Sequence, residues 1–287
     1  MPLPLPTLLP WIALCLAAAL LWPSATRRYA LVVLAVGYAW GWAQGALDPI
    51  VLLWLALLLA AGWAVRAAGP SWRRATGHAL FMALAAGLGL HLLPGFHNAQ
   101  AIAAARYTAD AAPFSMYLNL DKPLLAFWVV LAAAPSMAGA DAGATLRAAL
   151  AACAAAAVAC LGVALAVGLV GWAPKWPAQG WLWLANNALL VTLAEEALFR
   201  GYVQQQLTAR WGHHRGGAVL AIGAAALLFG LAHLAGGVQW VALASLAGVA
   251  YGVAYRYGGL AAAVLAHLGL NTLHFACFTY PMRAVAG

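Results

Sequence analysis

Long apolar runs, separated by short stretches with proline, glycine or charged residues, recur along nearly the whole 287-residue chain. Each run holds about 17 to 25 residues, enough for a helix that rises 1.5 Å per residue to cross a hydrocarbon core about 30 Å thick. The pattern predicts an all-α fold, a polytopic transmembrane bundle of about ten helices. The expected spans lie near residues 7–23, 29–46, 49–67, 78–94, 123–140, 144–171, 181–205, 217–236, 238–256 and 258–279.

Composition supports this interpretation and excludes a water-soluble fold. Apolar residues make up 66% of the chain and charged residues only 7%, against roughly a quarter charged in ordinary soluble domains. The net charge of +8 is scattered through short loops, so we expect no nucleic-acid partner. We expect a multi-pass protein whose surroundings are the lipid bilayer, in a bacterial inner (cell) membrane.

The distribution of basic residues predicts the orientation of the spans. Nine arginines lie in the odd-numbered loops, whereas four basic residues lie in the even-numbered loops and the C-terminal tail. Because lysine and arginine favour the cytoplasmic side, both termini are expected outside the cytoplasm. The first apolar run follows Met1 without a basic stretch and is expected to be a retained span. The four cysteines lie inside apolar runs, form no CxxC and predict neither disulfides nor a zinc knuckle.

A polar interruption divides the chain into three predicted parts. Residues 1–95 form an N-terminal addition of four spans without an assigned role, and residues 123–287 form a core of about six spans. The intervening residues 96–122 are rich in aromatic and polar side chains. This composition suits a segment lying at the membrane interface, and a plain solvated loop explains it equally well.

Three charged residues stand out within one predicted span. Of six acidic residues, only the adjacent Glu195 and Glu196 lie in the middle of a span, together with Arg200. A charge there costs roughly 2.5 to 3.5 kcal/mol on insertion scales. In an α-helix Glu196 and Arg200 share a face and can neutralise each other, whereas Glu195 points about 100° away. Glu195 is then either held by a neighbouring helix or, as a buried carboxylate, suited to proton transfer near neutral pH.

Two later spans carry polar groups as well. One contains His233 in the sequence FGLAH, and another contains His267 and Asn271 in HLGLNTLH. The i, i+4 spacing lets His267 and Asn271 project into one cavity as hydrogen-bond donors. Taken alone, His233 could be a satisfied core histidine and the His267–Asn271 pair could join helices. Their occurrence together with Glu195 favours a functional site.

These segments resemble a known family of membrane peptidases. EEALFR at 195–200 is similar to the EExxxR motif of the CAAX-protease and bacteriocin-processing (CPBP, Abi-type) family, FGLAH at 229–233 to its FxxxH motif, and HLGLN at 267–271 to its HxxxN motif. The motifs occur in the family's order on separate spans. The resemblance covers about residues 123–280, and YLNLDKP at 117–123 is similar to a segment that precedes the core in some members.

The resemblance implies an intramembrane glutamate-type endopeptidase. Glu195 and His233 would bind and deprotonate a water, and His267 and Asn271 would donate hydrogen bonds to the oxyanion. Glu196 and Arg200 would balance charge in the helix. No cofactor is expected from this mechanism. A zinc ion bound by Glu195, His233 and His267 is the alternative.

The resemblance is compatible with several substrates, and the polar residues are compatible with two other functions. The expected substrate is a membrane-embedded or lipidated protein or peptide, such as a prenylated C-terminus, a C-terminal sorting segment or a bacteriocin-like peptide. A noncatalytic scaffold or immunity protein could keep the same polar residues as structural contacts. A proton-coupled transporter could use them as a relay, although the chain lacks the repeated broken helices typical of such transporters.

Overall fold

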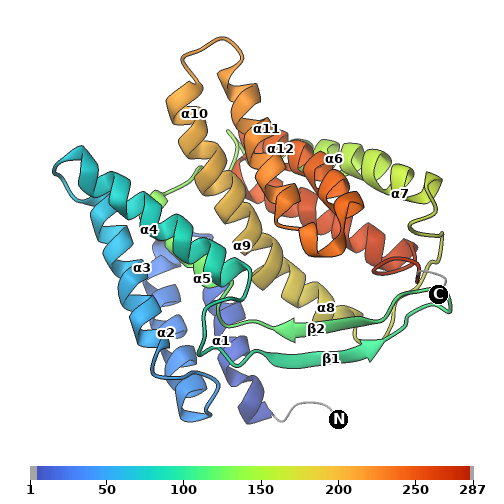
Figure 1. Ribbon diagram of the computed structural model, residues 1–287, viewed down its shortest axis with the longest axis horizontal. Coiled ribbons are helices and arrows are strands. Elements are labelled where there is room, and N and C mark those ends of the chain that lie inside the picture. The colour runs from blue at the N-terminus through green and yellow to red at the C-terminus, as the bar shows by residue number, and fades with distance from the viewer. Residues whose placement is uncertain (1–4, 285–287) are drawn as a thin grey trace. The chain divides into compact units, whose positions relative to one another are not determined.

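The computed structural model describes residues 5–284, and the chain is mostly helical, as predicted (Figure 1). The helices are α1 Leu5–Leu20, α2 Arg27–Ala43, α3 Val51–Arg66, α4 Ser71–Gly89, α5 Leu124–Trp128, α6 Ala142–Ala156, α7 Gly162–Ala166, α8 Gly180–Asn186, α9 Thr192–Glu196, α10 Gln205–Trp211, α11 Gly217–Leu231 and α12 Val238–Cys277. Four π-helical segments continue helices without a break: η2 Val129–Ala133, η3 Ala157–Leu161, η4 Asn187–Val191 and η5 Ala197–Gln204. Short 3-10 turns, η1 Ser24–Thr26 and η6 Leu234–Gly236, complete the helical elements.

The polar interruption contains strands, so the prediction of a purely α-helical fold is wrong in this segment. Strands β1 (Ala99–Ala105) and β2 (Phe114–Leu118) form a two-stranded sheet and run in opposite directions (Figure 1). In β2 the side chains alternate between more and less buried positions, ending with Met116 and Leu118 buried and Tyr117 exposed between them. This period of two is the ordinary signal of a half-buried strand.

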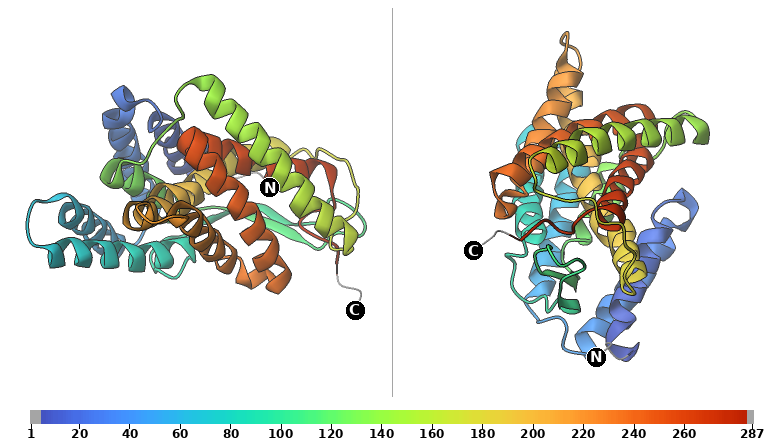
Figure 2. Two further views of the ribbon diagram at one scale, coloured as in Figure 1. Left: turned by 90° about the horizontal axis from the view of Figure 1, so that it is seen from above. Right: turned by 90° about the vertical axis from the view of Figure 1, so that its right-hand side faces the viewer.

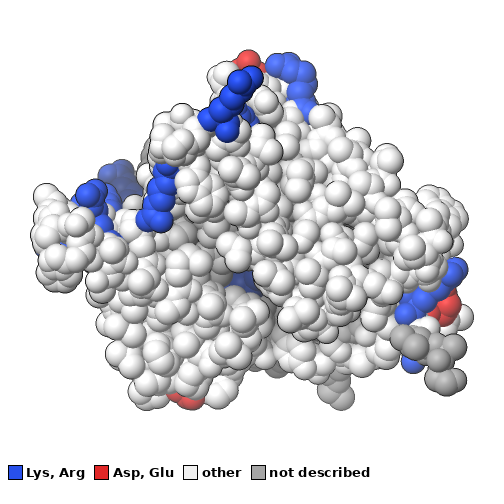
Figure 3. Space-filling model, turned by 45° about the horizontal axis from the view of Figure 1, so that its top comes forward, with Lys and Arg blue, Asp and Glu red and all other residues white. Residues whose placement is uncertain are grey.

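Within residues 5–284, two helices are long and apolar enough, by length and composition, to cross a membrane. They are the continuous helix Ala142–Ala166, with a mean hydropathy of 2.4, and Val238–Cys277, with a mean hydropathy of 1.5. Shorter apolar helices are Pro6–Leu20, Val51–Arg66, Leu124–Ala133 and Gly217–Leu231. Uncharged residues cover most of the face in Figure 3. The full count of about ten spans stays a prediction.

The chain divides into two compact units. The first comprises the described residues up to Ala101, then Tyr117–Ala134 and Leu189–Leu198. The second comprises Ile102–Met116, Pro135–Ala188 and the described residues from Phe199 onward. The division into an N-terminal addition and a peptidase core stays a prediction.

Helix pairs and an embedded short helix build the first unit. Helix α1 packs on α2, and α3 packs on α4. Glycines permit these contacts: a Cβ atom at Gly37 would lie 2.8 Å from the Cβ of Ala13, and one at Gly77 would lie 3.0 Å from the carbonyl oxygen of Ala61. Both distances are shorter than normal van der Waals contact, so the two helix pairs depend on small residues.

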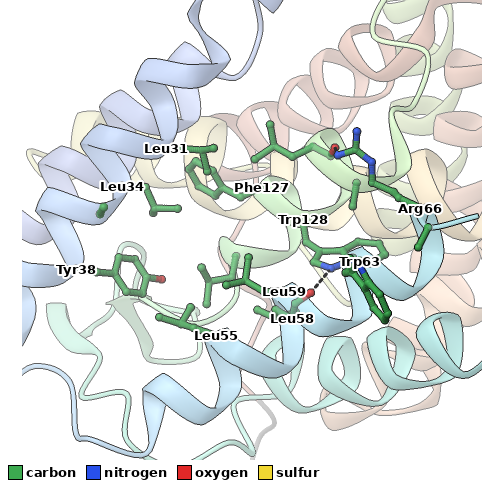
Figure 4. Close-up of a pocket in the computed structure, with 16 residues that line it drawn as sticks. Leu31, Leu34, Tyr38, Leu55, Leu58, Leu59, Trp63, Arg66, Phe127 and Trp128 are labelled. Atoms are coloured by element: carbon green, nitrogen blue, oxygen red, sulfur yellow. Dashed lines mark hydrogen bonds between the residues drawn. The ribbon is translucent and has the colours of Figure 1, made fainter.

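An open apolar groove of about 730 Å³ runs between α2, α3 and the α5–η2 segment (Figure 4). Leu31 and Leu34 line it from α2, Leu55 and Leu59 from α3, and Phe127 from α5. Its apolar walls suit a surface that faces hydrocarbon chains. The helix through η2 ends at Ala133, before the expected limit of residue 140, because the next residue adopts a left-handed conformation and is followed by a proline.

Helix α12 is the central element of the second unit and is broken in the middle. Gly259 has φ 69° and ψ −169°, which separates two helical halves. A Cβ atom at Gly259 would lie 2.5 Å from the backbone nitrogen of Ala138, so the position requires glycine. The amides of Leu260 and Ala261 then donate to the carbonyls of Ser136 and Met137 at 2.8 and 2.9 Å. The break agrees with the two helical segments predicted near residues 238–256 and 258–279.

Small residues let α6 pack closely on α12, beside which it runs in both views of Figure 2. The shared core joins alanines of α6, including Ala149, Ala152 and Ala156, to Ala247 and Tyr251 of α12. Helix α11 packs on α12 as well. Interfaces of small residues are typical of helices associating in lipid, where van der Waals contact replaces the hydrophobic effect.

Candidate active site

The helix that carries EEALFR changes its winding on both sides of the two glutamates. Helical elements follow one another from Gly180 to Trp211, and the short α-helix α9 (Thr192–Glu196) lies between the π-helical segments η4 and η5. π-Helical turns are rare and occur frequently at functional sites. Side-chain directions beyond Glu196 therefore depart from the regular α-helix that the i, i+4 argument assumed.

Arg200 is fully buried and has defined partners in the second unit. Its Nη2 donates to the carbonyl oxygen of Gly248 at 2.9 Å. Its guanidinium carbon lies 4.6 Å from the ring centre of Phe229 and 5.4 Å from that of Tyr251. Glu196 is likewise fully buried. The burial of Glu196 and Arg200 agrees with the prediction that both lie within a helical span. Charge balance between the two side chains stays a prediction.

A second contact one turn later repeats the Arg200 contact. Gln204 donates through Nε2 to the carbonyl oxygen of Gly252 at 2.9 Å. A Cβ atom at Gly252 would lie 2.8 Å from Gln204 Oε1, and one at Gly248 would lie 3.1 Å from Arg200 Nη2. The G-x-x-x-G spacing on α12 thus leaves room for two polar side chains of η5. These hydrogen bonds fix the helix that follows the glutamates against α12.

Three of the four predicted catalytic residues line one cavity inside the second unit. His233, which follows α11, and His267 and Asn271 of α12 surround a space of about 90 Å³. Liquid water occupies about 30 Å³ per molecule, so the cavity can hold water. Phe229 and Tyr251 contribute aromatic walls to the same cavity. A polar cavity with apolar walls matches the arrangement expected of an enclosed reaction site.

The hydrogen bond of His233 fixes its neutral tautomer. Its Nδ1 lies 2.8 Å from the carbonyl oxygen of Phe229, which can only accept a hydrogen bond. A neutral His233 therefore carries its proton on Nδ1, and Nε2 is left as the acceptor. An imidazole with its Nε2 lone pair available can accept a proton from water.

His267 and Asn271 are also held in place. The ring of His267 stacks on Tyr251 with 4.6 Å between centroids and an interplanar angle of 16°. Asn271 donates through Nδ2 to Oδ1 of Asn187 at 3.2 Å, and Asn187 donates to the carbonyl oxygen of Trp183 at 3.1 Å. The sequence analysis missed Asn187. The adjacent asparagines 186 and 187 in an apolar span were the signal that could have identified it.

His274 is a further cavity residue that the sequence analysis did not assign to the site. It lies on the cavity wall one turn beyond Asn271. Its Nε2 is buried and has no hydrogen-bond partner among the described residues. The rings of Trp240 and Tyr280 lie 6.1 and 5.0 Å from it, measured between centroids. A buried imidazole nitrogen without a protein partner is a natural position for a hydrogen bond to water.

Glu195 lies in the first unit and forms an ion pair with a lysine that is far from it in the sequence. Lys122 donates through Nζ to Oε1 of Glu195. The two side chains are 17% and 12% exposed, so the ion pair is largely enclosed. Lys122 belongs to YLNLDKP, which is similar to a segment that precedes the core in some members of the CPBP family. No local sequence rule connects positions so far apart, which explains why this pair was missed.

Within residues 5–284, the described side chains include no group of three or more His, Cys, Asp or Glu placed to hold a metal ion together. The alternative zinc set contains Glu195 from the first unit and His233 and His267 from the second. This zinc set stays a prediction.

Comparison with known proteins identifies the family of this region. Residues 176–273 match the family model described as type II CAAX prenyl endopeptidase Rce1-like. This range contains all three motifs and excludes Lys122 and the four N-terminal helices. Neither the curated proteins nor the solved structures contain a significant match to the chain. The resemblance to CAAX proteases is therefore confirmed for this part of the chain: residues 176–273 are similar to the type II CAAX prenyl endopeptidase Rce1-like family.

Proposed function

We propose that the protein is an intramembrane endopeptidase that hydrolyses a peptide bond with a water activated by Glu195. The observation that carries the proposal is the cavity shared by His233, His267 and Asn271, within the segment that matches a CAAX endopeptidase family. Hydrolysis needs a base for water, donors for the oxyanion and a space that admits water. We assign the base to Glu195 with His233 and the donors to His267 and Asn271, and the cavity of about 90 Å³ would admit the water.

Glu195 and His233 act on the water. The Glu195 carboxylate accepts one proton from water while Nε2 of His233 orients the molecule. The resulting hydroxide attacks the carbonyl carbon of the scissile bond and forms a tetrahedral intermediate. When the carbon–nitrogen bond breaks, the proton held by Glu195 passes to the leaving amine. The proposed reaction consumes one water for each peptide bond, returns Glu195 to its carboxylate form and uses no metal or other cofactor.

His267 and Asn271 stabilise the oxyanion of the intermediate. An asparagine amide carries two N–H donors, and the contact with Asn187 uses one of them. The second can donate toward the substrate oxygen. Stacking on Tyr251 holds the His267 ring in a fixed plane. Donors that are already oriented need not reorient as charge develops on the oxygen. Most of their catalytic effect comes from this preorganisation.

We propose a substrate that is embedded in or attached to a membrane. The protein would act as a multi-pass protein of a bacterial inner membrane, on a lipidated C-terminus, a C-terminal sorting segment or a bacteriocin-like peptide. The apolar exterior brings such substrates to the protein by diffusion within the bilayer. Glu196 and Arg200 would balance charge in the helix that presents Glu195.

The test compares protein C-termini in membranes of the native host that carry the wild type or Glu195→Gln. Mass spectrometry maps the termini, and trypsin-accessible loops report insertion of each variant. Asp48→Asn is the matched control, because it converts an exposed carboxylate to an amide outside the proposed site. We expect a defined set of processed termini to disappear in Glu195→Gln and to persist in Asp48→Asn.

Unchanged termini in an inserted Glu195→Gln variant would overturn catalysis by Glu195. The polar residues would then belong to a noncatalytic scaffold or immunity protein. Proton-dependent solute uptake that is lost in Glu195→Gln, with termini unchanged, would instead identify a transporter.

A further inference from the structure

Lys122 lies at the start of a helix that the first unit holds from several sides. The residue precedes α5 by two positions, and its Nζ donates to Glu195 of α9. Helices α5 and α9 pack on each other within this unit. The ion pair therefore joins two elements that are also in van der Waals contact. An enclosed pair of this kind restricts the rotamers of both side chains more than an exposed pair would.

A buried polar network fixes the turn that carries Lys122. Asp121 is 1% exposed and accepts from the backbone amide of Lys122 at 2.9 Å. His91 Nδ1 lies 2.7 Å from Oδ2 of Asp121, and Asn98 donates to its Oδ1 at 3.2 Å. Asn98 also accepts from the amide of Leu120 at 2.8 Å. Together these hydrogen bonds restrain the backbone at Lys122.

The network requires a local conformation that few residues adopt without cost. His91 follows the end of α4 and has φ 57°, in the left-handed region. A non-glycine residue held there costs about 1 to 3 kcal/mol, and such positions persist where surrounding contacts determine them. At His91 the contact is the hydrogen bond to Asp121. In this conformation the His91 side chain contacts the residue that directly precedes Lys122.

Helices α2, α3 and α4 hold the turn and the helix that follows it; the bond between Trp128 and Leu58 of α3 is drawn in Figure 4. Tyr38 donates to the carbonyl oxygen of Leu120, and Trp128 donates through Nε1 to the carbonyl oxygen of Leu58 at 2.8 Å. The Trp128 ring stacks on Phe81, with 3.6 Å between centroids. The turn and helix α5 are therefore fixed to three of the four N-terminal helices. This rigid attachment is what a group that supports a reactive side chain needs.

We propose that Lys122 is a positioning residue for Glu195 and that the N-terminal helices serve the active site by holding Lys122. The inference rests on the proposed function, because it assigns Lys122 to the carboxylate that would activate water. The ammonium group holds the carboxylate through Oε1 and so restricts the rotation of the Glu195 side chain. This gives α2, α3 and α4, which lie outside the family match, a role in the chemistry.

The test combines a double-mutant cycle with turnover measurements on the full-length protein. Lys122→Met and Glu195→Gln are made singly and together. Lys122→Arg keeps a cation at this position. As a control, Arg74→Met removes an exposed cation of the same unit. Thermal unfolding in detergent gives the coupling between the two positions. A synthetic peptide that carries a Glu195-dependent cleavage site, presented in liposomes, gives kcat and KM.

We expect Lys122→Met to lower the unfolding midpoint by several degrees in the wild-type background and by much less in Glu195→Gln, because the carboxylate is then absent. We expect kcat to fall at least tenfold with KM nearly unchanged, and Lys122→Arg to recover most of this loss. Arg74→Met should behave like the wild type. Independent, additive effects on unfolding would refute the ion pair, and coupling with unchanged kcat would refute the positioning role.

Failure of the proposed function gives a different result. In that case no processed terminus depends on Glu195, whereas the unfolding cycle still reports whether Lys122 and Glu195 interact. Loss of processing in Glu195→Gln together with normal turnover in Lys122→Met would overturn the inference alone.

Discussion

Replacing Asn187 by alanine should slow peptide hydrolysis, because this residue orients the proposed oxyanion donor. Asn187 is 8% exposed and accepts from Nδ2 of Asn271 at 3.2 Å. Without that acceptor the Asn271 amide can rotate, and its second N–H no longer points consistently at the substrate oxygen. The change removes no residue that we propose to contact the substrate.

The expected magnitude follows from the hydrogen bond that is lost. A neutral hydrogen bond contributes about 0.5 to 1.5 kcal/mol net, and about 1.4 kcal/mol corresponds to a tenfold change in rate. We therefore expect kcat to fall about two- to tenfold in Asn187→Ala. Removal of the donor itself in Asn271→Ala should cost roughly 10²- to 10³-fold. The double variant should be no slower than Asn271→Ala, since Asn187 then has no donor to orient.

The assay is steady-state cleavage of a mapped peptide by the reconstituted protein. Asn186→Ala is the matched control: this buried asparagine is the adjacent residue of the same helix, 5% exposed. It should retain nearly normal kcat. The reasoning would be refuted if Asn187→Ala and Asn271→Ala reduced kcat independently, with multiplicative effects in the double variant, or if Asn186→Ala were as slow as Asn187→Ala.

Three further predictions concern stability and cofactors. Arg200→Met should lose about 2 to 5 kcal/mol of unfolding free energy, because it removes a charged hydrogen bond to Gly248 and buried cation–π contacts. Denaturation in detergent measures this loss. Arg200→Lys should lose less. Hydrogen bonds, chiefly from Thr108 and also from Arg283, lower the pKa of Asp110. Its stabilising effect is therefore present above about pH 4 and is lost as the pH falls; Asp110→Asn should flatten the acid limb of the thermal unfolding curve. A zinc chelator should leave peptide cleavage unchanged, and inactivation reversed by zinc would contradict the metal-free mechanism.

Hydrophobic pattern was sufficient to predict most helices, because each apolar run is bounded by local signals. The apolar runs predicted separate helical segments at 238–256 and 258–279, and the structure has a break at Gly259 with a positive φ. The motif residues His233, His267 and Asn271 share a cavity, as the i, i+4 spacing and the motif order indicated. These features depend on short stretches of chain, which is why sequence alone could identify them.

Features that depend on distant residues were not predictable in the same way. The strand pair at Ala99–Ala105 and Phe114–Leu118 was missed because its alternation is short and rich in alanine. The contacts of Lys122 with Glu195 and of Asn187 with Asn271 join positions 73 and 84 residues apart. Only the folded chain brings such pairs together. The π-helical winding around α9 also has no recognised sequence signal.

The central claim is that water cleaves a peptide bond at a site that depends on Glu195. The most direct measurement incubates the reconstituted protein and a mapped peptide in water labelled with a heavy oxygen isotope, and then weighs the products. The account predicts one labelled oxygen atom in the new C-terminal carboxylate of the wild-type product, and no product from an intact, inserted Glu195→Gln variant. A product without the label, or equal product from Glu195→Gln, would contradict it.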